Sequence, residues 1–255
     1  MAHKPEGDRD SELTPPDVPE IVRKIRVRTP ARLLVGRVGA TYRTATQLEL
    51  REAHAAARDA ARSELNLERD LGSDFLERWN LLENHTRATT KDEYLLRPDL
   101  GRQLDDSSRP AIQANCTPAC DLQIAIGDGL SVAAVVAQVP SLLPLLCAGA
   151  QQRRWQLGRI LVIHHCRVGI LNEIGELLRP RVAVLLIGER PGLATAESLS
   201  VYIAAQPNKL HTDANRHVIS NIHARGLAPH QAAERILALA ARLMNSVTNG
   251  PVLPV

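Results

Sequence analysis

Short apolar runs, each followed by a glycine or a polar residue, dominate the second half of the chain. Runs of this kind occupy residues 122–126, 159–164 and 181–187. The third contains no polar residue after Arg181 and therefore has no polar face, which is typical of a strand covered on both sides in a parallel sheet. We expect a strand at each run and a further short strand at 217–220.

Helical patterns alternate with these strands. One helix is expected to begin at Ser131, others to cover 174–178 and 197–204, and a last helix to span 229–247. In that last segment apolar residues recur at helical spacing and form one stripe. Strands that alternate with helices predict an α/β fold, here a Rossmann-like layered domain with a mainly parallel sheet.

The first part of the chain predicts helices rather than strands. Alanine-rich sequence between residues 44 and 82 propagates a helix well, whereas the polar segment 105–110 has the composition of a linker. We therefore expect a helical N-terminal extension at 21–104 and the Rossmann-like domain at 110–255. Residues 1–20 are polar and rich in proline, which predicts a disordered tail.

The apolar stretch from Leu130 to Ala150 has about the length of a membrane span. Gln138, Pro140 and Pro144 interrupt it, so it predicts two short buried helices rather than a membrane-crossing one. The charged, proline-rich start of the chain has no apolar core of the kind a secretory signal needs. We expect a cytoplasmic protein without a membrane partner.

Composition narrows the function classes further. The formal charge is +3, from 31 basic and 28 acidic residues, and aromatic residues make up only 2%. This balance argues against electrostatic binding of nucleic acid, and the lack of aromatic residues argues against base stacking. Cys116 and Cys120 do not form a Cys-x-x-Cys pair, so we expect structural thiols and no metal site.

Two glycine-bearing loops follow predicted strands, at 127–129 and 188–192. In a parallel sheet both open on the same edge, where ligands commonly bind. Glu189 offers a fixed hydrogen-bond acceptor there, and Arg190 could pair with it, with Glu197 or with a partner protein. The complete glycine fingerprint of dinucleotide-binding proteins and the phosphate-binding loop are both absent, so neither NAD nor ATP chemistry is expected.

Several motifs in fixed order resemble one family. From about Val35 to Val247 the chain is similar to the small subunit of ethanolamine ammonia-lyase, an adenosylcobalamin enzyme. The motifs that carry the likeness are Lys91-Asp-Glu-Tyr-Leu-Leu-Arg-Pro-Asp-Leu-Gly101, Asp128-Gly-Leu-Ser131, Ile174-Gly-Glu-Leu177, Gly188-Glu-Arg-Pro-Gly-Leu193 and Ile219-Ser-Asn-Ile222.

The resemblance implies a two-subunit enzyme that converts ethanolamine to acetaldehyde and ammonia. The small subunit would sit on a large TIM-barrel subunit, with adenosylcobalamin between them. Ethanolamine would be bound mainly by the large subunit, so this chain would be inactive alone and would supply no catalytic residue. A higher hetero-oligomer is expected, located in the cytoplasm or inside a bacterial microcompartment. The tail would be either a packaging signal or a solvated extension.

The resemblance also implies which residues contact the cofactor. By their place in the family's motifs these are Val168, Glu189 and Val218. The chain departs from the family pattern at two nearby positions, with Cys166 in place of glycine and Val218 in place of the usual cysteine. The Asp-x-His-x-x-Gly signature of base-off cobalamin proteins is absent, which implies base-on binding.

Without the resemblance, two other interpretations of the residues remain. The chain could be a free-standing Rossmann-like module that binds a nucleotide, or a protein-interaction module without catalytic activity. Neither predicts a dependence on cobalamin.

Overall fold

The computed structural model describes residues 19–28, 36–192 and 195–249. The chain divides into two compact units, Met1–Leu50 and Arg51–Val255, which are described separately. Of the tail expected to be disordered, residues 1–18 lie outside the described part. The first unit contains helix α1, a small antiparallel hairpin and the start of helix α2; their bounds are Glu20–Val27 (α1), Arg37–Val38 (β1), Thr41–Tyr42 (β2) and Thr44–Arg62 (α2).

A six-stranded sheet forms the centre of the second unit, with the strand order β3-β5-β4-β6-β7-β8. The strands from β3 to β6 in this order run parallel, and β7 and β8 are antiparallel to their neighbours. The sheet is therefore mainly parallel, as expected. The strands span Leu82–His85 (β3), Leu122–Gly127 (β4), Leu161–His164 (β5), Val182–Gly188 (β6), Leu199–Ala205 (β7) and His217–Ile222 (β8).

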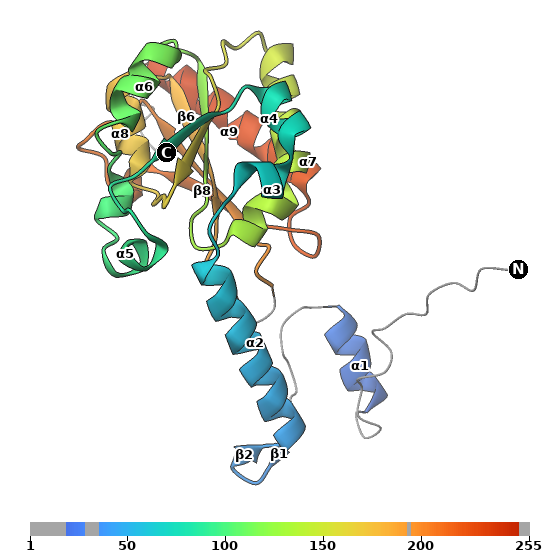
Figure 1. Ribbon diagram of the computed structural model, residues 1–255. Helices are drawn as coiled ribbons and strands as arrows, with labels where there is room; N and C mark the ends of the chain where they lie inside the picture. The colour runs from blue at the N-terminus through green and yellow to red at the C-terminus, as the bar shows by residue number, and fades with distance from the viewer. Residues whose placement is uncertain (1–18, 29–35, 193–194, 250–255) are drawn as a thin grey trace, which may run out of the picture. The chain divides into compact units, whose positions relative to one another are not determined.

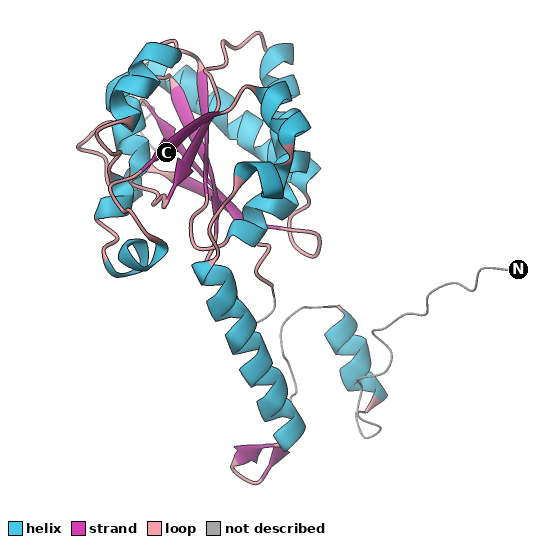
Figure 2. Ribbon diagram, viewed as in Figure 1, coloured by secondary structure: helices cyan, strands magenta, loops and turns pink. Residues whose placement is uncertain are grey.

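Helices cover both faces of this sheet, which gives the unit three layers (Figures 1 and 2). One face packs against α7 and α9, with α3 and α4 beside α7; the other packs against α6 and α8. The helices span Leu67–Leu71 (α3), Ser73–Trp79 (α4), Lys91–Leu96 (α5), Ser108–Asn115 (α6), Val132–Gln152 (α7), Ile170–Leu178 (α8) and Pro229–Asn249 (α9).

Strand β6 shows why a continuous apolar run predicts a central strand. Every residue from Val182 to Gly188 is buried. Successive side chains of a strand point to opposite faces, so Val184 belongs to the core beneath α7 and α9, while Leu185 belongs to the core beneath α8. An apolar residue is needed at every position because each face is covered by helices.

The helix expected at 197–204 is wrong, because this segment forms strand β7. β7 runs antiparallel to β6, with Leu199 opposite Gly188. Val201, Tyr202 and Ile203 are β-branched or aromatic residues, which favour a pleated surface over a helix. The alternation of strands and helices along the chain therefore ends at β6.

Helix α7 is one continuous helix, and the two separate pieces expected there are wrong. Pro140 and Pro144 lie inside it. Each proline removes a backbone hydrogen bond, but Leu142, Leu143 and Leu146 are completely buried, and this packing favours an unbroken helix. By length and composition α7 could cross a membrane, although more than half of its most apolar stretch is buried within the protein.

The boundary expected at 104–110 falls inside the second unit. Strand β3 is hydrogen-bonded to β5 along its whole length, from Leu82 opposite Leu161 to His85 opposite His164. Residues well before the expected linker therefore belong to the same sheet as β4 and β6. The boundary between the two compact units lies earlier, between Leu50 and Arg51.

Two glycines in helices test how tightly the layers pack. A Cβ atom on Gly175 would lie 1.7 Å from the backbone oxygen of Pro207, whereas one on Gly149 would lie 2.1 Å from the end of the Leu237 side chain. We expect Gly175→Ala to lower the free energy of unfolding by about 1–3 kcal/mol, the usual cost of overpacking. Gly149→Ala should cost less, because a leucine side chain can rotate away and a backbone cannot. Urea unfolding of both variants measures this; equal losses would contradict the packing described.

Candidate functional site

A cavity of about 400 Å³ opens where β4 and β6 end. Three of the residues that line it are the predicted cofactor contacts, Val168, Glu189 and Val218. They come from three segments that are far apart in sequence: the loop after β5, the loop after β6, and strand β8. The fold therefore brings all three predicted residues to one cavity, although their role in binding stays a prediction.

The two glycine loops meet at this cavity, as expected for the carboxyl ends of neighbouring parallel strands. Gly129 has a φ of +57°, a conformation that favours glycine. A Cβ atom there would lie 2.4 Å from the carbonyl oxygen of Gly188. The backbone N–H of Leu130 donates a hydrogen bond to that same oxygen at 3.1 Å. Small residues are needed on both loops because the two backbones touch.

Glu189 is held in place by three hydrogen bonds from strands β7 and β8 and the turn before them. The hydroxyl of Ser198 donates to its carboxylate at 2.7 Å, the hydroxyl of Ser200 also donates, and the backbone N–H of Asn221 donates at 3.1 Å. Partial burial alone would raise the pKa of Glu189, but these hydrogen bonds outweigh it and hold the pKa below its usual value. The side chain is therefore a fixed, ionised acceptor at neutral pH.

The carboxylate still has capacity for a ligand. An ionised carboxylate has about four acceptor positions, and the described residues occupy three of them. Arg190, next in sequence, is exposed and also lines the cavity. Glu189 can thus accept one more hydrogen bond from an N–H or O–H group without losing its own support.

Two valines also line the cavity. Val218 lies on β8 opposite Tyr202 of β7, and 53% of its surface is exposed. Val168, in the loop after β5, is partly buried and contacts the core beneath α8. An exposed valine in a concave site gains stability when a partner covers it. This arrangement suits a ligand with a large apolar face and a few polar groups at its rim.

A buried ion pair fixes the loops around the cavity. The ammonium group of Lys91 lies 3.3 Å from the carboxylate of Asp128 and donates to the carbonyl of Gly129 at 2.9 Å. The second carboxylate oxygen of Asp128 accepts the backbone N–H of Cys166 at 2.9 Å. The Lys91 and Asp128 side chains are 4% and 1% exposed, so water screens the pair very little.

Tyr94 and Arg167 extend this network to the cavity wall. The Tyr94 hydroxyl donates to the carbonyl of Cys166 at 3.1 Å, and the guanidinium of Arg167 lies over the Tyr94 ring, 4.1 Å from its centre. Sequence reasoning assigned no role to Lys91, Tyr94, Asp128 or Arg167. Lys91, Tyr94 and Asp128 lie in motifs that carry the resemblance, and this is the only signal that pointed to them.

The cysteines are unsuited to nucleophilic chemistry. Burial raises the pKa of Cys120 and of Cys147 to about 11, and it raises the pKa of Cys116 and Cys166 as well. A thiol with such a pKa is protonated at neutral pH, whereas the thiolate is the reactive form. Burial therefore disfavours the reactive thiolate form at all four positions.

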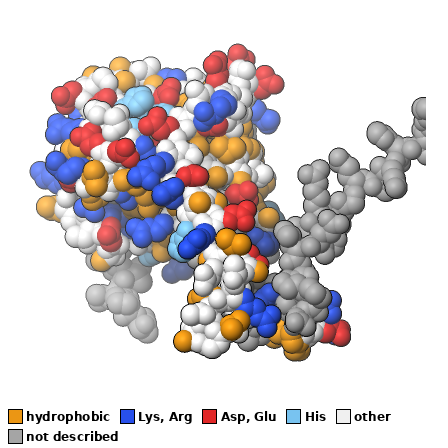
Figure 3. All heavy atoms as spheres, turned by 60° about the horizontal axis from the view of Figure 1, so that its bottom comes forward, with side chains coloured by type: hydrophobic (Ala, Val, Ile, Leu, Met, Phe, Trp, Pro, Cys, Tyr) orange, Lys and Arg blue, Asp and Glu red, His pale blue; other side chains and the backbone are white. Residues whose placement is uncertain are grey.

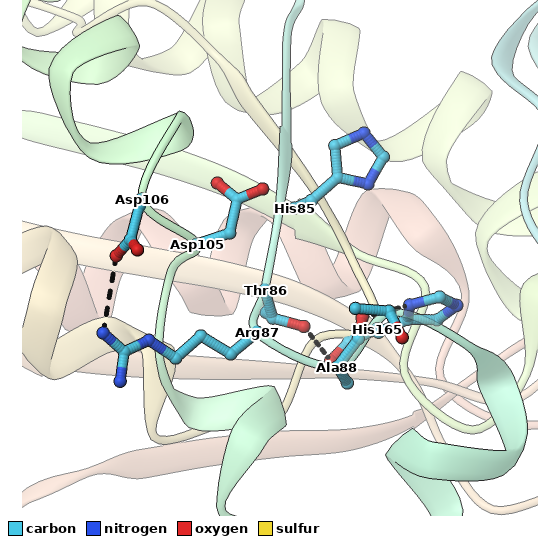
Figure 4. A pocket seen from close by; sticks show the side chains of 8 residues that line it. His85, Thr86, Arg87, Ala88, Asp105, Asp106 and His165 are labelled. Atoms are coloured by element: carbon cyan, nitrogen blue, oxygen red, sulfur yellow. Dashed lines mark hydrogen bonds and ion pairs between the residues drawn. The ribbon is translucent and has the colours of Figure 1, made fainter.

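A second cavity, of about 310 Å³, lies beside the end of β3 (Figure 4). Its polar groups are largely paired with one another. Arg87 lies 3.4 Å from the carboxylate of Asp106, and the Nδ1 atom of His165 lies 2.8 Å from the carbonyl oxygen of Ala88. Basic and acidic side chains are mixed across the described surface visible in Figure 3, where they lie side by side.

The Lys91–Asp128 pair can be tested by removing one charge or both. Lys91→Met leaves a buried carboxylate without its partner, so we expect a loss of about 3–5 kcal/mol in the free energy of unfolding. The double variant with Asp128→Asn removes both charges and should recover much of that loss. Arg97→Met, which breaks an exposed pair with Asp99, serves as the control and should change stability little. A Lys91→Met loss no larger than the control's would contradict the role assigned to the pair.

Comparison with known proteins identifies the family. Residues 19–253 match the family model of the ethanolamine ammonia-lyase light chain (EutC). A protein named ethanolamine ammonia-lyase small subunit from Listeria monocytogenes is 40% identical over 227 residues, which cover 89% of this chain and 75% of that protein. A protein of the same name from Clostridium perfringens is 39% identical over 231 residues, which cover 91% of this chain and 76% of that protein. The chain therefore belongs to the family of ethanolamine ammonia-lyase small, or light, subunits.

Proposed function

We propose that this chain forms one wall of an adenosylcobalamin site at its contact with the large subunit of ethanolamine ammonia-lyase. Family membership makes it a subunit of a lyase and implies a large-subunit partner. The proposal of a cofactor site rests on one observation, which is that Val168, Glu189 and Val218 all line one cavity. Their match to the family's cofactor contacts rests on motif position alone and is independent of their positions in space.

The residues present fit a corrinoid. Its ring has an extended apolar face, which Val168 and Val218 can cover, and its side-chain amides and ribose hydroxyls can donate to Glu189. Adenosylcobalamin is much larger than a cavity of about 400 Å³ can enclose. A second wall from another chain is therefore required, and the half-exposed Val218 is suited to be buried when the ligand and that wall are in place.

The contribution of this chain is binding and exclusion of water rather than a chemical step. When bound, adenosylcobalamin supplies the radical chemistry by homolysis of its cobalt–carbon bond. Glu189 orients the ligand through a hydrogen bond, and the two valines keep water away from its face. Ethanolamine binds mainly on a TIM-barrel large subunit, and the cofactor stays base-on. The complex is a higher hetero-oligomer in the cytoplasm, and the interior of a bacterial microcompartment is the alternative location.

Replacing Glu189 tests the site. Glu189→Ala should weaken adenosylcobalamin binding by the reconstituted complex about tenfold, corresponding to one hydrogen bond to a charged group. Assembly of the two subunits should be unchanged. The cofactor is titrated into wild-type and variant complexes, with Glu197→Ala as the control because Glu197 is an exposed acid nearby in the chain. Equal affinities for the wild type and Glu189→Ala would remove Glu189 from the site.

Reconstitution tests the proposal as a whole. The isolated chain should neither convert ethanolamine nor bind nucleotides, and activity should require both the large subunit and adenosylcobalamin. Specific nucleotide binding by the isolated chain would favour a free-standing binding module instead. A stable complex indifferent to cobalamin would favour a pure interaction protein.

A further inference from the structure

Three potential metal ligands gather at the edge of the sheet, on β3 and β5. Glu83 and His85 are two residues apart on β3, so their side chains share one face of the strand. His164 is the register partner of His85 on the neighbouring strand β5. The pleat and the parallel register together place a carboxylate and two imidazoles side by side, and their ligand atoms all lie within 4.8 Å of one another.

The contacts within this cluster are close. The Nε2 atom of His164 lies 2.7 Å from a carboxylate oxygen of Glu83. The imidazole rings of His85 and His164 are stacked, with centroids 4.7 Å apart and planes inclined by 17°. Figure 4 shows the His85 ring well apart from that of His165, so the neighbouring histidine is not part of the cluster.

The backbone at His85 is fixed on both sides, which makes the cluster a built site. One side of β3 is bonded to β5. On the other, the hydroxyl of Ser108 accepts the backbone N–H of His85 at 2.8 Å, and the backbone N–H of Asp105 donates to the His85 carbonyl at 3.0 Å. The edge strand is therefore held in register, while the exposed side chains of Glu83 and His85 keep the freedom to adjust.

We propose that Glu83, His85 and His164 bind a divalent transition-metal ion of the Zn²⁺ type. Two imidazoles and a carboxylate are a ligand set that suits Zn²⁺ and its neighbours better than Mg²⁺ or Ca²⁺. Tetrahedral coordination with bonds of about 2.1 Å places ligand atoms roughly 3.4 Å apart. The exposed Glu83 and His85 side chains would rotate to reach that spacing, which turns the His85 ring out of its stack on His164, and water would complete the coordination.

The proposed ion would join the edge strand β3 to β5. A ligand that binds the folded but not the unfolded chain stabilises the fold. This stabilisation should be measurable because β3 has only four residues and, among the described strands, pairs only with β5. Sequence analysis missed this site because Glu83 and His85 lie about eighty residues before His164 in the chain.

Zn²⁺ titration of the full chain tests the proposal. We expect one saturable equivalent of Zn²⁺ and a rise in Tm that Mg²⁺ at the same concentration does not produce. His85→Gln should lower Zn²⁺ affinity by at least the roughly 10- to 100-fold that loss of an outer partner costs, and should abolish the Tm rise. Glu83→Gln should act in the same direction. Both residues are exposed, so these variants are expected to fold without metal.

The matched control is His230→Gln, which removes an exposed histidine on α9. It should keep wild-type Zn²⁺ affinity and the full rise in Tm. The proposal is overturned if the wild-type chain shows no saturable Zn²⁺ binding. It is equally overturned if His85→Gln and His230→Gln bind Zn²⁺ alike, because the ion would then sit elsewhere, for example on cysteine.

Discussion

The buried carboxylate of Asp128 holds together the edge of the sheet that carries the cavity. It follows β4 and contacts two other segments at once: Lys91 at the start of α5 and the backbone N–H of Cys166 after β5. A buried charge is costly unless it is paired and hydrogen-bonded. The three segments therefore favour a single arrangement, and Val168 and Gly129 at the cavity are placed by it.

The reversal of strand direction after β6 fixes a second part of the cavity, in addition to the part fixed by the Lys91–Asp128 pair. Because β7 runs back alongside β6, Ser198 and Ser200 lie beside the loop that carries Glu189 and donate to its carboxylate. The cavity thus has one rim fixed by the Lys91–Asp128 pair and another fixed by hydrogen bonds to Glu189. Preorganised polar groups of this kind bind a ligand without first having to be ordered.

The sequence predicted the parts of the fold that depend on local pattern. Strands β4, β5 and β6 and helix α9 follow from apolar runs and from one clear amphipathic stripe. Strand β7 was missed because the segment 195–200 has the composition of a helix start, and β3, which lies before the expected boundary at 104–110, pairs with a strand far away in sequence. The site residues came from motif resemblance, whereas the Lys91–Asp128 pair and the Glu83–His85–His164 cluster join residues 37 to 81 positions apart, which no local pattern reveals.

The central claim is that the edge of this sheet encloses half of a corrinoid. The most direct measurement is an experimental structure of the chain assembled with its large subunit in the presence of adenosylcobalamin. The account predicts that the corrin ring lies against Val168 and Val218, with Glu189 accepting a hydrogen bond from the cofactor. A structure in which this cavity faces open solvent, while the cofactor is bound wholly within the other subunit, would contradict it.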